Sequence, residues 1–107
     1  MARVYVLNKG SHNYSDARRF GDIHVVSDGL IPVSNVGLMY RMVQEAFKGA
    51  SPDDYIVLSS LTSLCSVACA SFAARFKRLN LLIWDGKSRY VERHMVFDPQ
   101  LQLDKEK

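Results

Sequence analysis

Hydrophobic residues fall into short continuous runs that polar loops separate, a pattern typical of strands buried in a sheet. The clearest run covers 54–58 and passes through Ser59 and Ser60 into a helical pattern that extends to Phe76. An apolar run that opens through a tight loop into a helix indicates a buried parallel strand followed by its crossover helix. Similar runs predict three further strands, at 4–7, 23–26 and 79–84.

Two other segments carry helical signals. Apolar residues recur every three or four positions over 36–47, which predicts an amphipathic helix. A shorter helix over 16–20 is expected after the first strand, with Ser15 as its cap. The turn signal Asp85-Gly86 precedes the alternating segment 89–97, which predicts a fifth strand that pairs back as a hairpin.

The order of these elements predicts an α/β fold, a single three-layer Rossmann-like sandwich with a mostly parallel sheet of about five strands. The strand order 2-1-3-4-5 is favoured because it places the first and third strands side by side, with helices leaving them toward opposite faces. The domain is expected to span 1–98, with a C-terminal edge hairpin, and to be followed by a flexible tail over 99–107.

Polar residues collect after the first and third predicted strands, where α/β sheets bind ligands. Helix N-termini favour anions, the Lys, His and hydroxyl groups of these loops suit a phosphate, and Tyr14 suits a base or a sugar. Polar residues also end strands in any α/β fold, so the same residues fit solvated loops and helix caps, with Thr62 as one cap. The candidate ligand-binding residues are Asn8, Lys9, Gly10, Ser11, His12, Tyr14, Ser59, Ser60, Thr62 and Ser63.

His12 is the candidate for acid–base catalysis, because imidazole titrates near neutral pH and this residue lies in the favoured loop. The pattern offers it no carboxylate partner, since Asp85 fits a hairpin turn better than a catalytic role. Neither a Walker lysine motif nor a dinucleotide fingerprint is present. Whether the protein is an enzyme therefore stays open.

Composition and charge limit the kinds of partner that the protein is expected to bind. The 107 residues are 48% hydrophobic and 23% charged, as in one globular domain, and the formal charge of +3 comes from scattered basic residues, so nucleic acid is not an expected partner. No apolar run approaches the roughly 20 residues that span a membrane, which predicts a cytoplasmic protein without a membrane partner. Cys65 and Cys69 lie one helical turn apart and predict reduced core thiols, so no metal and no cofactor are expected.

Three segments, 11–21, 53–62 and 78–86, together resemble short proteins encoded by tailed bacteriophages. The resemblance spans most of the chain. It implies an accessory phage product in the cytoplasm of the bacterial host, and it carries over no activity and no functional residue.

The sequence leaves three hypotheses for the function of the protein. The leading hypothesis is a small module that binds a nucleotide or another phosphorylated small molecule at the carboxyl ends of the first and third strands. The alternative is a phage accessory protein that binds or inhibits a host protein without a small ligand. The third is hydrolysis or transfer of a phosphoryl or nucleotidyl group with His12 as the base. A homodimer is also predicted, formed through the fifth strand or through the 39–47 helix.

Overall fold

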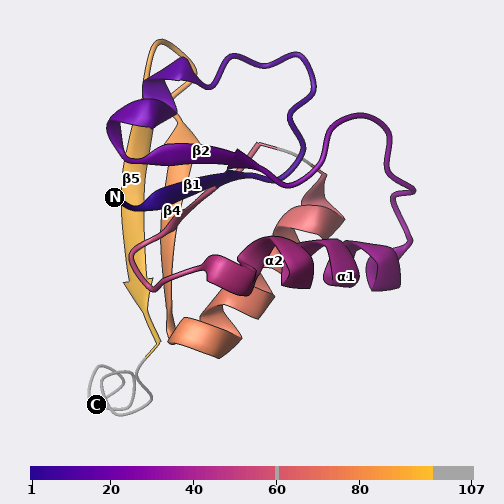
Figure 1. Cartoon of the computed structure of the whole chain (residues 1–107). Helices are drawn as coiled ribbons and strands as arrows, with labels where there is room; N and C mark the ends of the chain where they lie inside the picture. The colour runs from indigo at the N-terminus through magenta and orange to yellow at the C-terminus, as the bar shows by residue number, and fades with distance from the viewer. Residues whose placement is uncertain (60, 98–107) are drawn as a thin grey trace, which may run out of the picture.

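The computed structural model describes residues 1–59 and 61–97, so Ser60 and the predicted tail over 99–107 lie outside the described residues. Five strands form one sheet (Figure 1): β1 (Arg3–Val6), β2 (Asp22–Val25), β3 (Tyr55–Val57), β4 (Arg78–Trp84) and β5 (Tyr90–Val96). The helices are the α-helices α1 (Val36–Ala46) and α2 (Thr62–Phe76) and the 3-10 helices η1 (Ser15–Arg19) and η2 (Phe47–Gly49).

The strand order is β2-β1-β3-β4-β5, which confirms the predicted order. Strands β1 to β4 run parallel to one another, and β5 pairs antiparallel with β4. Val6 lies opposite Val57 of β3, so β1 and β3 end side by side at one edge of the sheet. The protein is therefore an α/β protein with a five-stranded, mostly parallel sheet.

Alternate residues of each strand face two different layers. Tyr5 and Ile56 pack with residues of α1 and α2, which share one face of the sheet (Figure 1). Val6 and Val57 pack on the other face with Tyr14 and with residues of η1. The crossovers after β1 and β3 therefore leave the sheet toward opposite faces, as the pattern predicted, but the segment after β1 forms a 3-10 helix.

Two predicted helix caps are wrong. The residue that precedes η1 is Tyr14, because Asn13 already accepts the backbone N–H of Ser15 through its side chain (2.8 Å) and so closes the turn one residue earlier. Thr62 is the first residue of α2 and not its cap. Leu61 occupies the cap position because its side chain packs against the core under the helices.

A buried carboxylate links β1 and β3 at their amino-terminal ends. Asp54, at the entry to β3, accepts the backbone N–H groups of Arg3 and Ser51, each at 2.9 Å. Buried carboxylates require such donors because they lose their hydration on folding. Asp54 therefore fixes the start of β1 against the start of β3, and the two strands run in register to the carboxyl edge.

Candidate functional site

A cleft of about 520 Å³ opens at the carboxyl edge of the sheet, on the face that carries η1. Three segments that are distant in the sequence form it: the loop after β1 together with the start of η1, the end of β3, and the turn between β4 and β5. Its lining residues are His12, Asn13, Ser15, Asp16, Ser59, Trp84, Ser88 and Tyr90.

Tyr14 holds the loop after β1 against the end of β3. Its ring is 7% exposed and packs on the sheet, while its hydroxyl oxygen lies 3.1 Å from the carbonyl oxygen of Lys9 and 3.2 Å from Oγ of Ser59. Because the phenol has one proton and the carbonyl can only accept, donation to Lys9 leaves Ser59 as the donor to Tyr14. The loops after β1 and β3, which carry the predicted ligand-binding residues, therefore meet through a buried tyrosine.

Trp84 and Tyr90 give the cleft an aromatic wall. They are directly opposite each other on β4 and β5, and their ring centroids lie 5.1 Å apart in an edge-on arrangement. Tyr90 is buried, whereas Trp84 remains 42% exposed. An exposed tryptophan face beside polar groups is suited to stacking a planar ligand.

Asp16 supplies the negative charge of the cleft. Its carboxylate accepts the backbone N–H of Tyr90 at 2.6 Å and the Nε–H of Arg19 at 3.3 Å. The hydrogen bond from Tyr90 and the nearby Arg19 guanidinium lower the pKa of Asp16 below its ordinary value. The carboxylate therefore stays ionised at neutral pH and docks η1 beside β5.

The hairpin turn between β4 and β5 is closed by Asp85, as predicted. The Asp85 carboxylate accepts the backbone N–H groups of Lys87, Ser88 and Arg89, at 2.8 to 3.3 Å, and these bonds lower its pKa. Gly86 takes the positive φ of +84° that such a turn requires. The turn presents the Ser88 side chain to the cleft.

The predicted ligand-binding residues separate into groups. His12 and Ser59 line the cleft, and Tyr14 lies beneath it. Asn8 and Ser63 instead bond the loop after β2, where Asn8 donates to the carbonyl of Gly29 and Ser63 donates to that of Val33, each at 2.9 Å. The exposed residues Lys9, Gly10, Ser11 and Thr62 are not among the cleft's lining residues, and Ser60 lies outside the described residues.

Sequence reasoning missed six of the eight residues that line the cleft, two of which, Asn13 and Ser15, lie in the predicted loop or at the start of its helix. Asp16, Trp84, Ser88 and Tyr90 were not candidates, although the predicted strand order already placed β4 beside β3 and therefore its carboxyl end at the same edge. The signal was available in the position of Trp84, the last residue of β4 and the neighbour of the turn residue Asp85. Asp16 carried no comparable signal, because its partner Tyr90 is 74 residues away.

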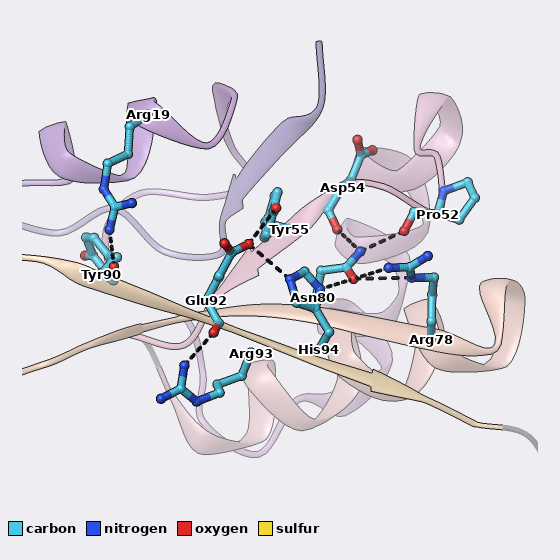
Figure 2. A network of polar contacts seen from close by, with 10 residues as sticks. All are labelled: Arg19, Pro52, Asp54, Tyr55, Arg78, Asn80, Tyr90, Glu92, Arg93 and His94. Atoms are coloured by element: carbon cyan, nitrogen blue, oxygen red, sulfur yellow. Dashed lines mark hydrogen bonds and ion pairs between the residues drawn. The ribbon is translucent and has the colours of Figure 1, made fainter. Parts of the chain in front are cut away.

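A second polar cluster lies on the same face of the sheet, at its opposite end (Figure 2). Its centre is Asn80 of β4, which is 1% exposed and fully hydrogen-bonded. The amide group donates to the carbonyls of Pro52 and Asp54, at 2.7 and 2.8 Å, and its oxygen accepts Arg78 and Nδ1 of His94, at 3.0 and 2.8 Å. Asn80 thus ties the turn before β3 to β4 and β5.

His94 bridges this amide to a carboxylate. Its Nε2 lies 3.0 Å from Oε2 of Glu92, which also accepts the Tyr55 hydroxyl at 3.0 Å (Figure 2). Both ring nitrogens therefore face side-chain oxygens, Oδ1 of Asn80 and Oε2 of Glu92. The hydrogen bonds from His94 and Tyr55 lower the pKa of Glu92. Because both ring nitrogens are engaged in these contacts, His94 holds β5 in place and has no free nitrogen to act as a base.

Residues 2–97 match the family model described as Phage Pam3 gp32-like protein. The chain belongs to this family. No curated protein and no solved structure matches the sequence. Membership confirms the resemblance to a phage protein and adds no activity to it.

His12 and the thiols complete the candidates for chemistry. In the described part of the chain, His12 contacts the Tyr14 ring at 6.1 Å between centroids and makes no hydrogen bond to a carboxylate. Burial, with a smaller contribution from Cys65, raises the pKa of the Cys69 thiol to about 11.

Across residues 1–59 and 61–97, no group of three or more His, Cys, Asp or Glu side chains could hold a metal ion. No helix among these residues has the length and apolar character to cross a membrane.

A mostly apolar groove of about 740 Å³ lies between α1 and α2, on the side away from the sheet. Tyr40 of α1 is 53% exposed there, and Val36 on the same helix is exposed as well. Small residues of α2, Ala70 and Ala74, form the opposite side. This groove is separate from the cleft, because the sheet lies between the two helices and η1 (Figure 1).

Proposed function

We propose that the protein binds a nucleotide or another phosphorylated small molecule in the cleft at the carboxyl ends of β1 and β3. The observation that supports this is the combination of an exposed Trp84 face with the polar side chains of His12, Ser59 and Ser88 around one hollow. Small-molecule sites combine an apolar or aromatic surface with a few convergent polar groups. A base suits the Trp84 face, and hydroxyl groups suit a sugar.

The architecture supports the same location. We take the fold to be a reduced Rossmann-like sandwich in which η1 stands for one helical layer. In open α/β sheets, ligands bind outside the carboxyl ends of the strands, where the strand order reverses. In this sheet the reversal falls between β1 and β3, beside Ser59.

Trp84 makes this proposal directly testable, because it is the single tryptophan of the chain and lies in the cleft. Mono-, di- and cyclic nucleotides are titrated while the Trp84 fluorescence is recorded, and thermal unfolding is measured in parallel. A ligand at 100 times its dissociation constant is expected to stabilise the fold by about 2.7 kcal/mol. If no nucleotide changes either signal, the proposal is wrong.

Two variants locate the site. Trp84→Ala is expected to weaken ligand binding about 5- to 150-fold, because base stacking on an aromatic side chain contributes about 1–3 kcal/mol. Tyr40→Ala is the matched control, since it removes another exposed aromatic ring, from the α1–α2 groove. It is expected to leave ligand binding unchanged.

A second candidate function is binding of a bacterial host protein, which the apolar groove between α1 and α2 favours. Interface cores are enriched in tyrosine, and the exposed Tyr40 is placed to fill this role. A pull-down from bacterial lysate with Tyr40→Ala and Trp84→Ala separates the two functions. Loss of a specific partner in the first variant alone supports the groove, and equal capture by both variants and the wild type rejects it.

A further inference from the structure

A second hollow, of about 350 Å³, adjoins the cleft at the outer edge of β5. Its lining residues are Arg19, Phe20, Arg89, Tyr90, Val91, Glu92 and Arg93. Tyr90 lines both hollows. The 3-10 helix η1 and the turn between β4 and β5 contribute residues to both hollows. Asp16 and Ser88 line the cleft, and Arg19 and Arg89 line the second hollow. We call this second site the arginine hollow.

The two hollows differ in charge. The cleft is lined by the ionised Asp16, whereas the arginine hollow is lined by three arginines and one acidic residue, Glu92. A phosphate inside the cleft would lie near the Asp16 carboxylate, and like charges at short range repel. The Asp16 oxygens retain lone pairs beyond the bonds from Tyr90 and Arg19, so they suit a ribose hydroxyl or a base amino group instead.

Two of the three arginines, Arg19 and Arg93, are held in place by contacts with backbone carbonyls. Arg19 donates through Nη2 to the carbonyl of Tyr90, and Arg93 donates through Nη1 to that of Glu92 at 2.7 Å (Figure 2). The Arg19 guanidinium also lies over the Phe20 ring, 4.1 Å from its centroid. Guanidinium groups fixed in this way still have donors left, and their planar forks match phosphate oxygens.

We propose that the base and sugar of the ligand occupy the cleft while its phosphates lie in the arginine hollow, and that the ligand class is therefore a nucleoside phosphate that spans Tyr90. This inference rests on the proposed function and names the orientation of the ligand. It moves the phosphate away from the loop after β1, where Lys9 was one of the predicted phosphate contacts. Lys9 and Arg89 thus mark two alternative phosphate positions, and both side chains are exposed.

Calorimetric titrations of the wild type, Arg89→Ala and Lys9→Ala distinguish these positions. The probes are the four ribonucleosides with their 5′-monophosphates and 5′-diphosphates. In the wild type, each added phosphate is expected to tighten binding about tenfold, as one charge-assisted contact does. Arg89→Ala is expected to abolish most of this gain while nucleoside affinity stays within about threefold, and Lys9→Ala is expected to retain the gain.

Each outcome has a distinct reading. Loss of the phosphate gain in Lys9→Ala but not in Arg89→Ala overturns the inference and leaves the proposed function intact, as does equal affinity for nucleosides and their phosphates. Absence of binding by every probe overturns both. The variants are compared by thermal unfolding in parallel, and each is expected to unfold as the wild type does because both side chains are exposed.

Discussion

The hydroxyl groups of Tyr14 and Ser59 lie 3.2 Å apart, although 45 residues separate them in the sequence. This contact joins the loop after β1 to the end of β3, the two strands that are adjacent at the centre of the sheet. Since Ser59 lines the cleft, the contact with Tyr14 also positions one residue of the proposed binding site.

Tyr14→Phe is therefore predicted to lower both stability and ligand affinity. The substitution keeps the packed ring but removes the hydroxyl, which leaves the Lys9 carbonyl and Ser59 without this partner. A loss of about 0.5–1.5 kcal/mol in the free energy of unfolding is expected, as for a typical hydrogen bond. Urea unfolding measures it, and Tyr40→Phe on the exposed face of α1 serves as the control. Equal stability of the two variants would show that the hydroxyl contact contributes nothing.

A larger effect is predicted for Asn80→Ala. This amide is buried and bonds the carbonyls of Pro52 and Asp54 as well as His94, so its removal leaves polar groups unsatisfied. Each unsatisfied buried group costs about 1–3 kcal/mol, and the free energy of unfolding is expected to fall by at least that amount. The control is Gln44→Ala on the exposed side of α1, which should leave the urea midpoint in place. A midpoint shift no larger than that of the control would contradict this account of Asn80.

The strand order followed from the sequence because continuous apolar runs, such as Val4 to Leu7, identify strands that are buried on both faces. Short crossovers then leave few topologies. The nature of η1 did not follow. A five-residue segment has little periodicity of its own, and its conformation is set by tertiary contacts such as the bond from the Tyr90 backbone to Asp16.

Only part of the cleft could be predicted from the sequence. His12 and Ser59 follow strands, and a strand end is visible as a change from apolar to polar residues. Tyr14 looked like a ligand-contacting residue because no sequence pattern shows that an aromatic ring after a strand folds back under its own loop. Trp84 was assigned only to a strand, since an apolar residue at a strand end looks the same whether it packs inside or lines a cleft.

Acid is predicted to destabilise the protein partly through Glu92. Its pKa is lowered in the folded state by His94 and Tyr55, so the unfolded chain binds this proton more readily. The stabilisation is complete above the ordinary value of 4.5 and is lost as the pH falls through the lower folded pKa. Urea unfolding between about pH 6 and pH 3 is expected to show a smaller loss in Glu92→Gln than in the wild type.

The control for this experiment is Glu45→Gln. Glu45 pairs with Lys48 at 2.8 Å on the surface of the protein, and both side chains are 72% exposed. Exposed pairs of this kind contribute little to stability. This variant is expected to follow the wild-type pH dependence, and an identical curve for Glu92→Gln would remove Glu92 from the explanation.

Cys69 is predicted to resist alkylation in the folded protein. Its pKa of about 11 leaves about one thiol in a thousand ionised near pH 8, and the thiolate is the reactive form. In a Cys65→Ser background, mass spectrometry should find slow iodoacetamide labelling in buffer and rapid labelling in concentrated urea. Comparable rates in the two solutions would mean that the thiol is not protected by the fold.

Association through β5 depends on which part of its outer edge is open. The backbone N–H of Asp85 bonds the carbonyl of Arg89, and the backbone N–H of Phe97 bonds that of Lys77. These two bonds fix which residues of β5 bond to β4. The alternate residues of β5 direct their backbone groups away from β4. These outward residues are Tyr90, Glu92, His94 and Val96. Asp16 and Arg19 already bond the backbone N–H and carbonyl of Tyr90, so η1 covers the first half of the edge. The half around His94 and Val96 is left for a partner strand.

A weak homodimer is therefore predicted, with two copies of β5 paired antiparallel around Met95. This register places His94 opposite Val96 of the second copy and brings the two Met95 side chains, each 44% exposed, face to face across the twofold axis. Light scattering across a dilution series should show a mass that rises from 12.1 kDa toward twice that value. Met95→Glu should hold the mass at 12.1 kDa, because like charges directly opposite each other destabilise a strand pair, whereas Val25→Glu on the β2 edge should dimerise as the wild type does. A wild-type mass of 12.1 kDa at the highest concentration would mean that the cover from η1 protects the whole edge.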